Sequence, residues 1–325
     1  MQLNTIVKRA NKDIALVKKE VSKVVVGQDR VVDAIIKAIL CDGHILLEGV
    51  PGLAKTLMVR TIATIMGCDF KRIQFTPDLL PTDLIGITAY DKDRGFFVVK
   101  GPIFTNFILA DEINRAPPKV QSALLECMQE KQATIGRQSF KIPEPFFVLA
   151  TQNPLESLGT YPLPEAQIDR FLFKIKVDYP SIEEEQRILK NNITLKRFED
   201  YNLKQVLNAE KIIKLQEYTK QIYLDPKIEK YIVLIVDATR HPSKYNLKKG
   251  KYIEWGASPR ASIALFIASK ADALMNNKTF VLPQHVKNVA FDVLRHRIMI
   301  NYEGQSENIT PEDVIKEILD KVPIP

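Results

Sequence analysis

Residues 49–56, GVPGLAKT, and residues 107–112, FILADE, decide the fold of this chain. GVPGLAKT follows the apolar run HILLE at 44–48 and precedes a helical pattern that Gly67 ends. A strand, a glycine-bearing loop and a helix in this order are typical of a phosphate-binding loop. Because its backbone N–H groups and the start of the helix form a cradle for anions, the octamer predicts a nucleotide site.

Two side chains of this loop carry most of the predicted chemistry. Lys55 is expected to reach the β- and γ-phosphates, and the Thr56 hydroxyl is expected to bind Mg²⁺. Gly49 and Gly52 are expected to permit positive φ values and close approach of the phosphates. The general motif has glycine where this chain has Ala54, a small intrusion of one methyl group. The loop residues predicted to bind the nucleotide are Gly49, Val50, Pro51, Gly52, Leu53, Ala54, Lys55, Thr56 and Leu57.

FILADE is an apolar strand that ends in two acids. The strand delivers Asp111 to its C-terminal end, where a carboxylate can hold Mg²⁺ through water, and Glu112 is placed to accept a proton from an attacking water. The simpler interpretation is a strand followed by an acidic helix cap. The phosphate-binding loop upstream favours the functional interpretation.

Three later side chains extend the predicted site. Asn153 ends the strand-like run in LATQNP and can bond the γ-phosphate and the attacking water, although Asn-Pro also marks ordinary turns. Arg170, in EAQIDRF, follows a short predicted helix and is either a surface ion-pair partner or an arginine finger that reaches a neighbouring subunit. Arg260, in GASPRASIAL, is either a residue of an ordinary helix start or a contact to the γ-phosphate from a second domain.

This ordered set resembles the AAA+ ATPases, and within them the MoxR family. The similar strings are GVPGLAKT, GPIFTNFILADEINRAPPKVQSALLECMQE, ATQNP, LPEAQIDRF and GASPRA, within a match over about 24–300. The family usually has alanine before the Walker A lysine. The resemblance implies that Asn153 is the sensor-1 residue, Arg170 the finger and Arg260 the sensor-2 residue. It also implies that Val26, Gly27 and Gln28 border the adenine, and that Gln74 is a switch residue that orients Glu112.

The resemblance implies an ATP- and Mg²⁺-dependent hydrolase. Its catalytic residues would be Lys55, Glu112, Asn153, Arg170 and Arg260, with Thr56 and Asp111 at the metal. A homo-hexameric ring is implied, with a chaperone-like role in remodelling, maturation or metal insertion of a protein client. A partner with a von Willebrand factor A domain is characteristic of the family. The alternatives are a magnesium-chelatase-like motor subunit, a DNA-acting AAA+ ATPase and a nucleotide-sensing scaffold. A σ⁵⁴-type activator is disfavoured because the GAFTGA string is absent.

The remaining pattern predicts the architecture. Apolar strands near 44–49, 71–75, 106–112, 145–153 and 171–177 alternate with helices, which indicates an α/β fold with a parallel five-stranded sheet. Residues 86–101 and 131–143 predict two projecting hairpins, which the resemblance identifies as the helix-2 and pre-sensor-1 inserts. Phe96 and Phe97 on the first hairpin are equally suited to gripping a client or packing on a neighbouring subunit. Amphipathic helices then predict a large domain at 1–178 and an all-α lid domain at 179–325, with a hinge near Tyr179.

Composition bounds these predictions. The chain has 325 residues and a formal net charge of +7, and residues 201–300 carry 17 basic and 8 acidic side chains. The excess therefore lies mainly in the predicted lid, which weakens the case for nucleic-acid binding. No apolar run reaches the roughly 18 residues of a membrane helix. Three widely spaced cysteines and a charged N-terminus without a secretory h-region predict a cytoplasmic protein.

Overall fold

The structure is a computed structural model that describes residues 3–49, 55–93, 95–153, 159–177, 179, 181–191 and 197–325. The chain divides into two compact units, which are described separately. The larger comprises Asp13–Phe171 and Ile175–Lys214; the smaller comprises Met1–Lys12, Leu172–Lys174 and Leu215–Pro325. The division at residue 178 into a large and a lid domain stays a prediction.

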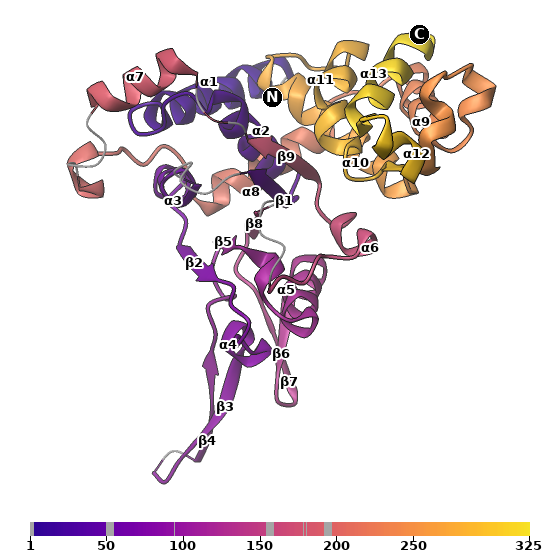
Figure 1. Ribbon diagram of the computed structural model, residues 1–325. Helices are drawn as coiled ribbons and strands as arrows, with labels where there is room; N and C mark the ends of the chain where they lie inside the picture. The colour runs from indigo at the N-terminus through magenta and orange to yellow at the C-terminus, as the bar shows by residue number, and fades with distance from the viewer. Residues whose placement is uncertain are drawn as a thin grey trace. The chain divides into compact units, whose positions relative to one another are not determined.

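A five-stranded parallel sheet organises the larger unit, as the alternation of strands and helices predicts (Figure 1). Its order is β2-β5-β8-β1-β9, so strands distant in sequence become neighbours. In the central strands β5 and β8 every residue except the last is buried, because nearly all of their side chains are apolar on both faces. The strands are β1 (Ile45–Gly49), β2 (Phe70–Gln74), β5 (Phe107–Asp111), β8 (Phe147–Gln152) and β9 (Phe173–Val177).

Helices whose apolar stripes repeat at helical spacing cover this sheet. Val31, Ile35 and Ile39 of α2 are buried on one stripe, and Val120, Leu124 and Met128 of α5 on another. The chain's helical segments up to the end of the larger unit are α1 (Leu3–Val21), α2 (Asp29–Leu40), α3 (Lys55–Ile65), α4 (Pro81–Ile85), η1 (Ile113–Arg115), α5 (Pro118–Glu130), α6 (Glu165–Ile168), α7 (Ile182–Asn191), η2 (Phe198–Tyr201) and α8 (Ala209–Gln221). The five-residue helix α4 is absent from the sequence-based expectation.

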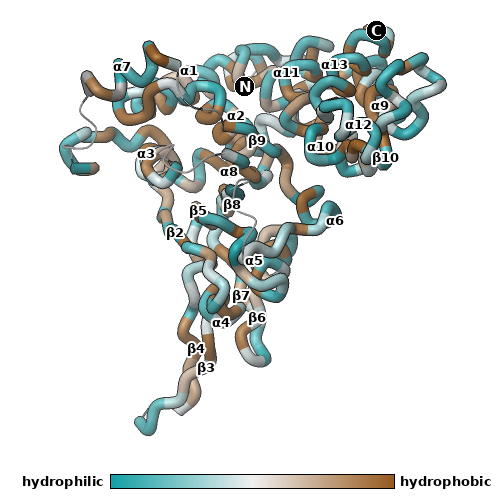
Figure 2. Tube along the Cα trace, in the orientation of Figure 1, coloured by the Kyte–Doolittle hydropathy of each residue, from teal (hydrophilic) through white to brown (hydrophobic). Residues whose placement is uncertain are grey.

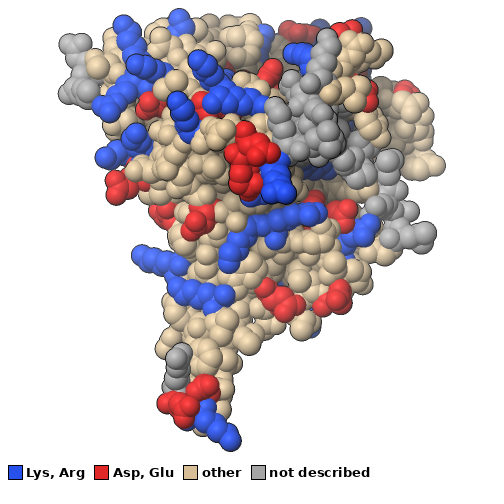
Figure 3. Space-filling model, turned by 90° about the vertical axis from the view of Figure 1, so that its left-hand side faces the viewer, with Lys and Arg blue, Asp and Glu red and all other residues tan. Residues whose placement is uncertain are grey.

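Two hairpins interrupt the alternation, as predicted. The first, β3 (Gly86–Asp91) with β4 (Gly95–Lys100), extends away from the sheet, and β6 (Gln132–Ile135) with β7 (Gln138–Lys141) forms the second (Figure 1). Figure 2 shows hydrophobic residues along β3 and β4 and a hydrophilic tip. Both charge signs meet at that tip in the space-filling view (Figure 3). Phe96 is 79% exposed, and its ring is tilted against that of Tyr90 with centroids 5.1 Å apart.

The base of the first hairpin is tightly closed. Gly86 has φ +107°, and a Cβ there would lie 2.1 Å from the Val99 carbonyl oxygen and 2.7 Å from the Gly101 nitrogen. The Gly101 N–H donates to the Ile85 carbonyl at 3.1 Å. Only glycine fits at Gly86, because both the backbone angle and the close approach exclude a side chain. The two strands of the hairpin therefore begin and end at the same point of the larger unit.

The smaller unit is mainly helical, in agreement with the predicted lid. Asp225, Ser258 and Thr310 each cap a helix with the side chain and precede a proline at its first position. No helix of the described residues is both long and apolar enough to cross a membrane. The elements of the smaller unit that follow α8 are α9 (Pro226–Arg240), η3 (Pro242–Tyr245), η4 (Lys249–Tyr252), β10 (Ile253–Trp255), α10 (Pro259–Met275), α11 (Pro283–Leu294), β11 (Met299–Ile300), α12 (Tyr302–Ser306) and α13 (Pro311–Lys321).

His44, just before β1, makes acid stability testable. The Val148 N–H donates to its Nδ1 at 3.1 Å, and its Nε2 lies 3.2 Å from the Met128 carbonyl oxygen. Burial lowers the pKa of His44 from 6.5 to about 4. Between pH 6.5 and about pH 4, His44 of the unfolded chain binds a proton and His44 of the folded chain does not. The free energy of unfolding therefore falls as the pH falls, by at most about 1.4 kcal/mol per pH unit.

Urea unfolding between neutral pH and about pH 5 is expected to show this loss. A His44→Asn variant serves as the control because its side chain does not titrate. Although less stable overall, it is expected to lose less stability over the same range. Equal slopes for the two proteins would show that His44 does not contribute.

Candidate active site

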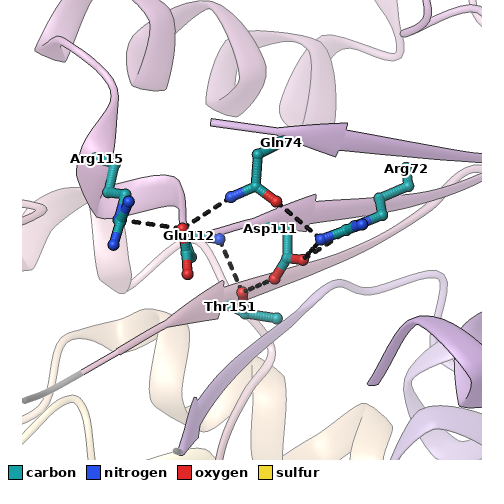
Figure 4. A network of polar contacts seen from close by, with 6 residues as sticks. All are labelled: Arg72, Gln74, Asp111, Glu112, Arg115 and Thr151. Carbon is teal, nitrogen blue, oxygen red and sulfur yellow. Dashed lines mark hydrogen bonds and ion pairs between the residues drawn. The ribbon is translucent and has the colours of Figure 1, made fainter. Parts of the chain in front are cut away.

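The carboxyl ends of β2, β5 and β8 bring a set of polar side chains together (Figure 4). Asp111 ends β5 and Glu112 follows it, while Gln74 ends β2 and is paired in register with Asp111. Thr151 lies near the end of β8, on the other side of β5. Parallel strands end at the same edge of a sheet, so the topology creates this cluster from residues far apart in sequence.

Asp111 is held from both neighbouring strands. The Thr151 hydroxyl donates to its Oδ1 at 2.7 Å. The Arg72 guanidinium donates to its Oδ2 through Nη2 at 2.7 Å and through Nε at 3.1 Å. The Asp111 side chain is 17% exposed and that of Arg72 is 49% exposed. The carboxylate is therefore fixed in orientation at the rim of the sheet.

Glu112 has a left-handed backbone, with φ 57° and ψ 50°, which few residues other than glycine adopt. Its N–H donates to the Thr151 hydroxyl at 2.9 Å, and its carbonyl accepts from the Arg115 N–H at 2.9 Å. Its Oε2 accepts from Gln74 Nε2 at 2.8 Å and pairs with Arg115 Nε at 3.1 Å. A strained conformation of this kind persists only where the surroundings hold it, and it turns the carboxylate toward β2 and η1 (Figure 4).

Lys55, the first residue of α3, belongs to the same electrostatic environment. Its Nζ donates to the Gly49 carbonyl oxygen at 3.0 Å. Burial lowers the pKa of Lys55, while the nearby carboxylates of Asp111 and Glu112 oppose that shift. A half-buried amine near two carboxylates is a suitable counter-charge for phosphate oxygens.

The oxygen atoms here suit Mg²⁺ with a nucleotide. Mg²⁺ prefers one or two carboxylates together with phosphate oxygens and water. Asp111 supplies a carboxylate, and the half-buried Thr56 follows Lys55 in the first turn of α3. The donor chemistry therefore fits the predicted metal ligands, Asp111 and Thr56.

The predicted loop is described in part. Val50, Pro51, Gly52, Leu53 and Ala54 lie outside the described residues. Gly49, Lys55, Thr56 and Leu57 flank them, at the end of β1 and the start of α3.

The expectation of a positive φ at Gly49 is wrong, because its φ lies outside the left-handed region. Glycine is required there by close packing: a Cβ would lie 2.7 Å from the Val177 carbonyl oxygen.

The predicted adenine-binding residues lie before α2. Gly27 has φ +75°, and a Cβ there would come within 2.8 Å of the Glu184 side chain on α7. Gln28 is the N-cap residue of α2. Val26, Gly27 and Gln28 are partly exposed, and their contact with adenine stays a prediction.

The three remaining predicted site residues differ in surroundings. Asn153 is 8% exposed and follows β8, one residue beyond its end. Arg170 is exposed after α6, and its Nη1 approaches the Leu125 carbonyl oxygen at 3.4 Å. Arg260 is exposed in the first turn of α10, in the smaller unit. Their roles stay predictions.

Sequence reasoning missed Arg72, Thr151 and Arg115. Alternation along β2 places Arg72 and Gln74 on one face, with Ile73 buried on the other, and this spacing of two was the available signal. Arg115 follows Glu112 by three residues in a helical turn, a spacing that favours contact. For Thr151 the sequence gives no signal, because its contacts depend on β8 lying beside β5.

Replacing Thr151 by Val is expected to lower the free energy of unfolding by about 1–3 kcal/mol, because the partly buried Glu112 N–H and Asp111 Oδ1 lose their partner. Thr151→Ser keeps the hydroxyl and removes one methyl group, at a cost of about 1 kcal/mol or less. Urea unfolding of both variants compares these losses. A Val variant as stable as the Ser variant would show that the hydroxyl contacts contribute nothing.

Two sequence families match the chain. Residues 44–173 match the family described as "ATPase family associated with various cellular activities (AAA)", and residues 248–318 match the AAA lid domain. The first match contains the cluster at the carboxyl edge of the sheet. The second covers much of the smaller unit.

Individual relatives match along nearly the whole chain. A Mycobacterium tuberculosis protein named "Chaperone MoxR1" is 48% identical over 94% of this chain and 81% of its own length. A Methylorubrum extorquens protein named "Protein MoxR" is 30% identical over 94% of each chain. The crystal structure of a Cytophaga hutchinsonii protein described as a candidate ATPase superposes with a TM-score of 0.93, at 49% identity, over 98% of this chain and 97% of that one.

Proposed function

The chain belongs to the MoxR family of AAA+ ATPases, and from that membership we propose that it hydrolyses ATP to remodel or mature a protein client. The observation that carries this proposal is the cluster at the carboxyl ends of β2, β5 and β8. There Asp111, Glu112 and the amine of Lys55 share one electrostatic environment. Such an arrangement of acids and amine serves phosphoryl transfer, in which catalysis is positioning and charge stabilisation.

Each residue has a distinct part in hydrolysis. Lys55 neutralises the β- and γ-phosphate oxygens, and Glu112 orients the attacking water and accepts its proton. Asn153, beyond the end of β8, bonds the γ-phosphate and that water. Thr56 and Asp111 hold Mg²⁺, which when bound supplies further charge neutralisation at the phosphates.

Gln74 sets the orientation of Glu112 before reaction. Its amide donates to the Glu112 carboxylate at 2.8 Å, so the acid is restrained toward β2. To accept a proton from water, the Glu112 carboxylate must either break this hydrogen bond to Gln74 or accept from Gln74 and water at the same time. Gln74 therefore acts as the switch residue that the family resemblance implies.

Assembly completes the site. The exposed guanidinium of Arg170 reaches the nucleotide of a neighbouring subunit in a homo-hexameric ring. Arg260, in the smaller unit, relates the nucleotide state to the angle between the two domains. ATP hydrolysis thereby drives a chaperone-like remodelling, maturation or metal insertion of a protein client. A protein with a von Willebrand factor A domain is the partner in this action.

Phosphate release by the purified full chain tests the enzymatic part of this proposal. Mg²⁺-dependent hydrolysis is expected, together with assembly on ATP in analytical ultracentrifugation. Lys55→Ala is the control, because it removes the amine that neutralises phosphate. Absence of Mg²⁺-dependent turnover in the assembled unaltered protein would contradict the proposal.

Partner binding is tested separately. A protein with a von Willebrand factor A domain, co-expressed with this chain, is expected to co-purify in ATP and to be released in ADP. If this protein does not bind, or binds equally in ATP and ADP, the partner assignment is contradicted and the ATPase assignment is unaffected.

A further inference from the structure

Arg72 lies where a cation is required for catalysis. It projects from the edge strand β2 toward the neighbouring strand β5, and its Nη2 and Nε both donate to Asp111 Oδ2 (Figure 4). Its register partner is Leu109, so the side chain extends along the strand to reach Asp111 two positions further. Asp111 is the carboxylate assigned above to Mg²⁺. The guanidinium and the metal thus have the same anionic partner.

The same guanidinium reaches Glu112 through an amide. Arg72 Nη2 also donates to Gln74 Oε1 at 2.9 Å, and Gln74 Nε2 donates to Glu112 Oε2 at 2.8 Å. Only this orientation of the amide satisfies both neighbours, because a guanidinium has no acceptor and a carboxylate has no donor. One cationic side chain therefore engages both acids, Asp111 directly and Glu112 through Gln74.

We propose that Arg72 is a positioning residue that competes with Mg²⁺ for Asp111, so that metal-bound nucleotide displaces the guanidinium and loosens the hold of Gln74 on Glu112. This inference rests on the proposed ATPase function. Arginine remains protonated at all working pH values, so it leaves Asp111 by moving, not by losing its charge.

Displacement is physically feasible because the Arg72 side of the pair is half exposed to solvent, although Asp111 is only 17% exposed. The Arg72 side chain is 49% exposed, and ion pairs of this exposure contribute little net stability. A divalent cation beside Asp111 attracts the carboxylate more strongly than the singly charged guanidinium of Arg72 does. The same cation also repels that guanidinium. The apparent affinity for metal-bound nucleotide is then reduced by the fraction of molecules in which Arg72 is closed on Asp111.

Equilibrium binding of a fluorescent ATP analogue, with Mg²⁺ and with EDTA, measures this competition. For Arg72→Met, the ratio of the EDTA to the Mg²⁺ dissociation constant is expected to rise about 2- to 10-fold above that of the unaltered protein. Lys71→Met, which removes the same charge at the neighbouring exposed position, is expected to leave the ratio unchanged. Arg72→Lys keeps the charge without the planar fork, so an intermediate ratio is expected.

The outcomes separate the competing explanations. A ratio in Arg72→Met that equals or falls below that of the unaltered protein overturns the proposal; weaker binding in both conditions would instead make Arg72 a direct phosphate contact. Thermal unfolding of each variant checks that the fold is intact. If the unaltered protein binds the analogue equally with Mg²⁺ and EDTA, the proposed metal site itself fails. If the unaltered protein does depend on Mg²⁺ but Arg72→Met has the same ratio of dissociation constants, the metal site stands and only the competition between Arg72 and Mg²⁺ is wrong.

Discussion

A Glu112→Gln variant is expected to bind ATP as the unaltered protein does and to hydrolyse it about 10²–10⁴-fold more slowly. The amide has nearly the shape of the carboxylate and still accepts from Gln74 and Arg115, whose donors lie 2.8 and 3.1 Å from Oε2. It cannot accept the proton of the attacking water. Phosphate release measures turnover, and filter binding measures retention of ATP.

The matched control for this variant is Glu126→Gln. Glu126 is exposed on α5, so the substitution removes the same charge away from the cluster. Its turnover is expected to equal that of the unaltered protein. Normal hydrolysis by Glu112→Gln would reject Glu112 as the base and favour another proton acceptor.

An Arg170→Ala variant is expected to assemble and bind ATP but to lose about 10³–10⁵-fold in turnover, the range seen when an arginine finger is absent. The side chain is exposed and has a long contact of 3.4 Å to the Leu125 carbonyl oxygen, so its removal leaves no buried group unpaired. The loss would therefore be catalytic rather than structural. Steady-state hydrolysis at a concentration that keeps the oligomer intact measures it.

Mixing distinguishes action on a neighbouring subunit from action within one chain. Arg170→Ala subunits retain the nucleotide site, and Lys55→Ala subunits retain the finger. In a head-to-tail ring, some interfaces of the mixture pair an intact site with an intact finger. The mixture is therefore expected to hydrolyse ATP although neither variant does alone. Mixed oligomers as inactive as their components would place Arg170 within its own site or outside catalysis.

The fold follows from patterns that single segments display. Continuous apolar runs of about five residues alternate with longer amphipathic helices, and both patterns are visible within the segment itself. The structure confirms the resulting parallel sheet, both hairpins and the mainly helical smaller unit. The pair of β10 and β11 was missed because these strands have only three and two residues. The helix α12 was missed because its five residues span little more than one helical turn.

The candidate site was predictable where its residues are adjacent in sequence. Asp111 and Glu112 end one strand, and Lys55 begins one helix, so linear motifs identify them. Arg72 and Thr151 instead depend on the order β2-β5-β8, which no segment specifies by itself. The left-handed backbone of Glu112 also escaped prediction, because that conformation is imposed by Thr151 and η1 and not by any preference of glutamate.

The closed base of the first hairpin has a consequence for how this family can diversify. Gly86 and Gly101 adjoin at the base, and Thr88 of β3 lies beside Gly136 of the second hairpin. Residues 89–99 therefore form a side branch whose loss or lengthening need not displace the strands that carry Asp111 and Gln74. A lineage can therefore exchange the exposed aromatic and charged side chains of this branch for others while its catalytic edge stays constant. Grafting the 89–99 segment of one relative onto another is therefore expected to change this exposed surface while the strand ends of the candidate site stay in place.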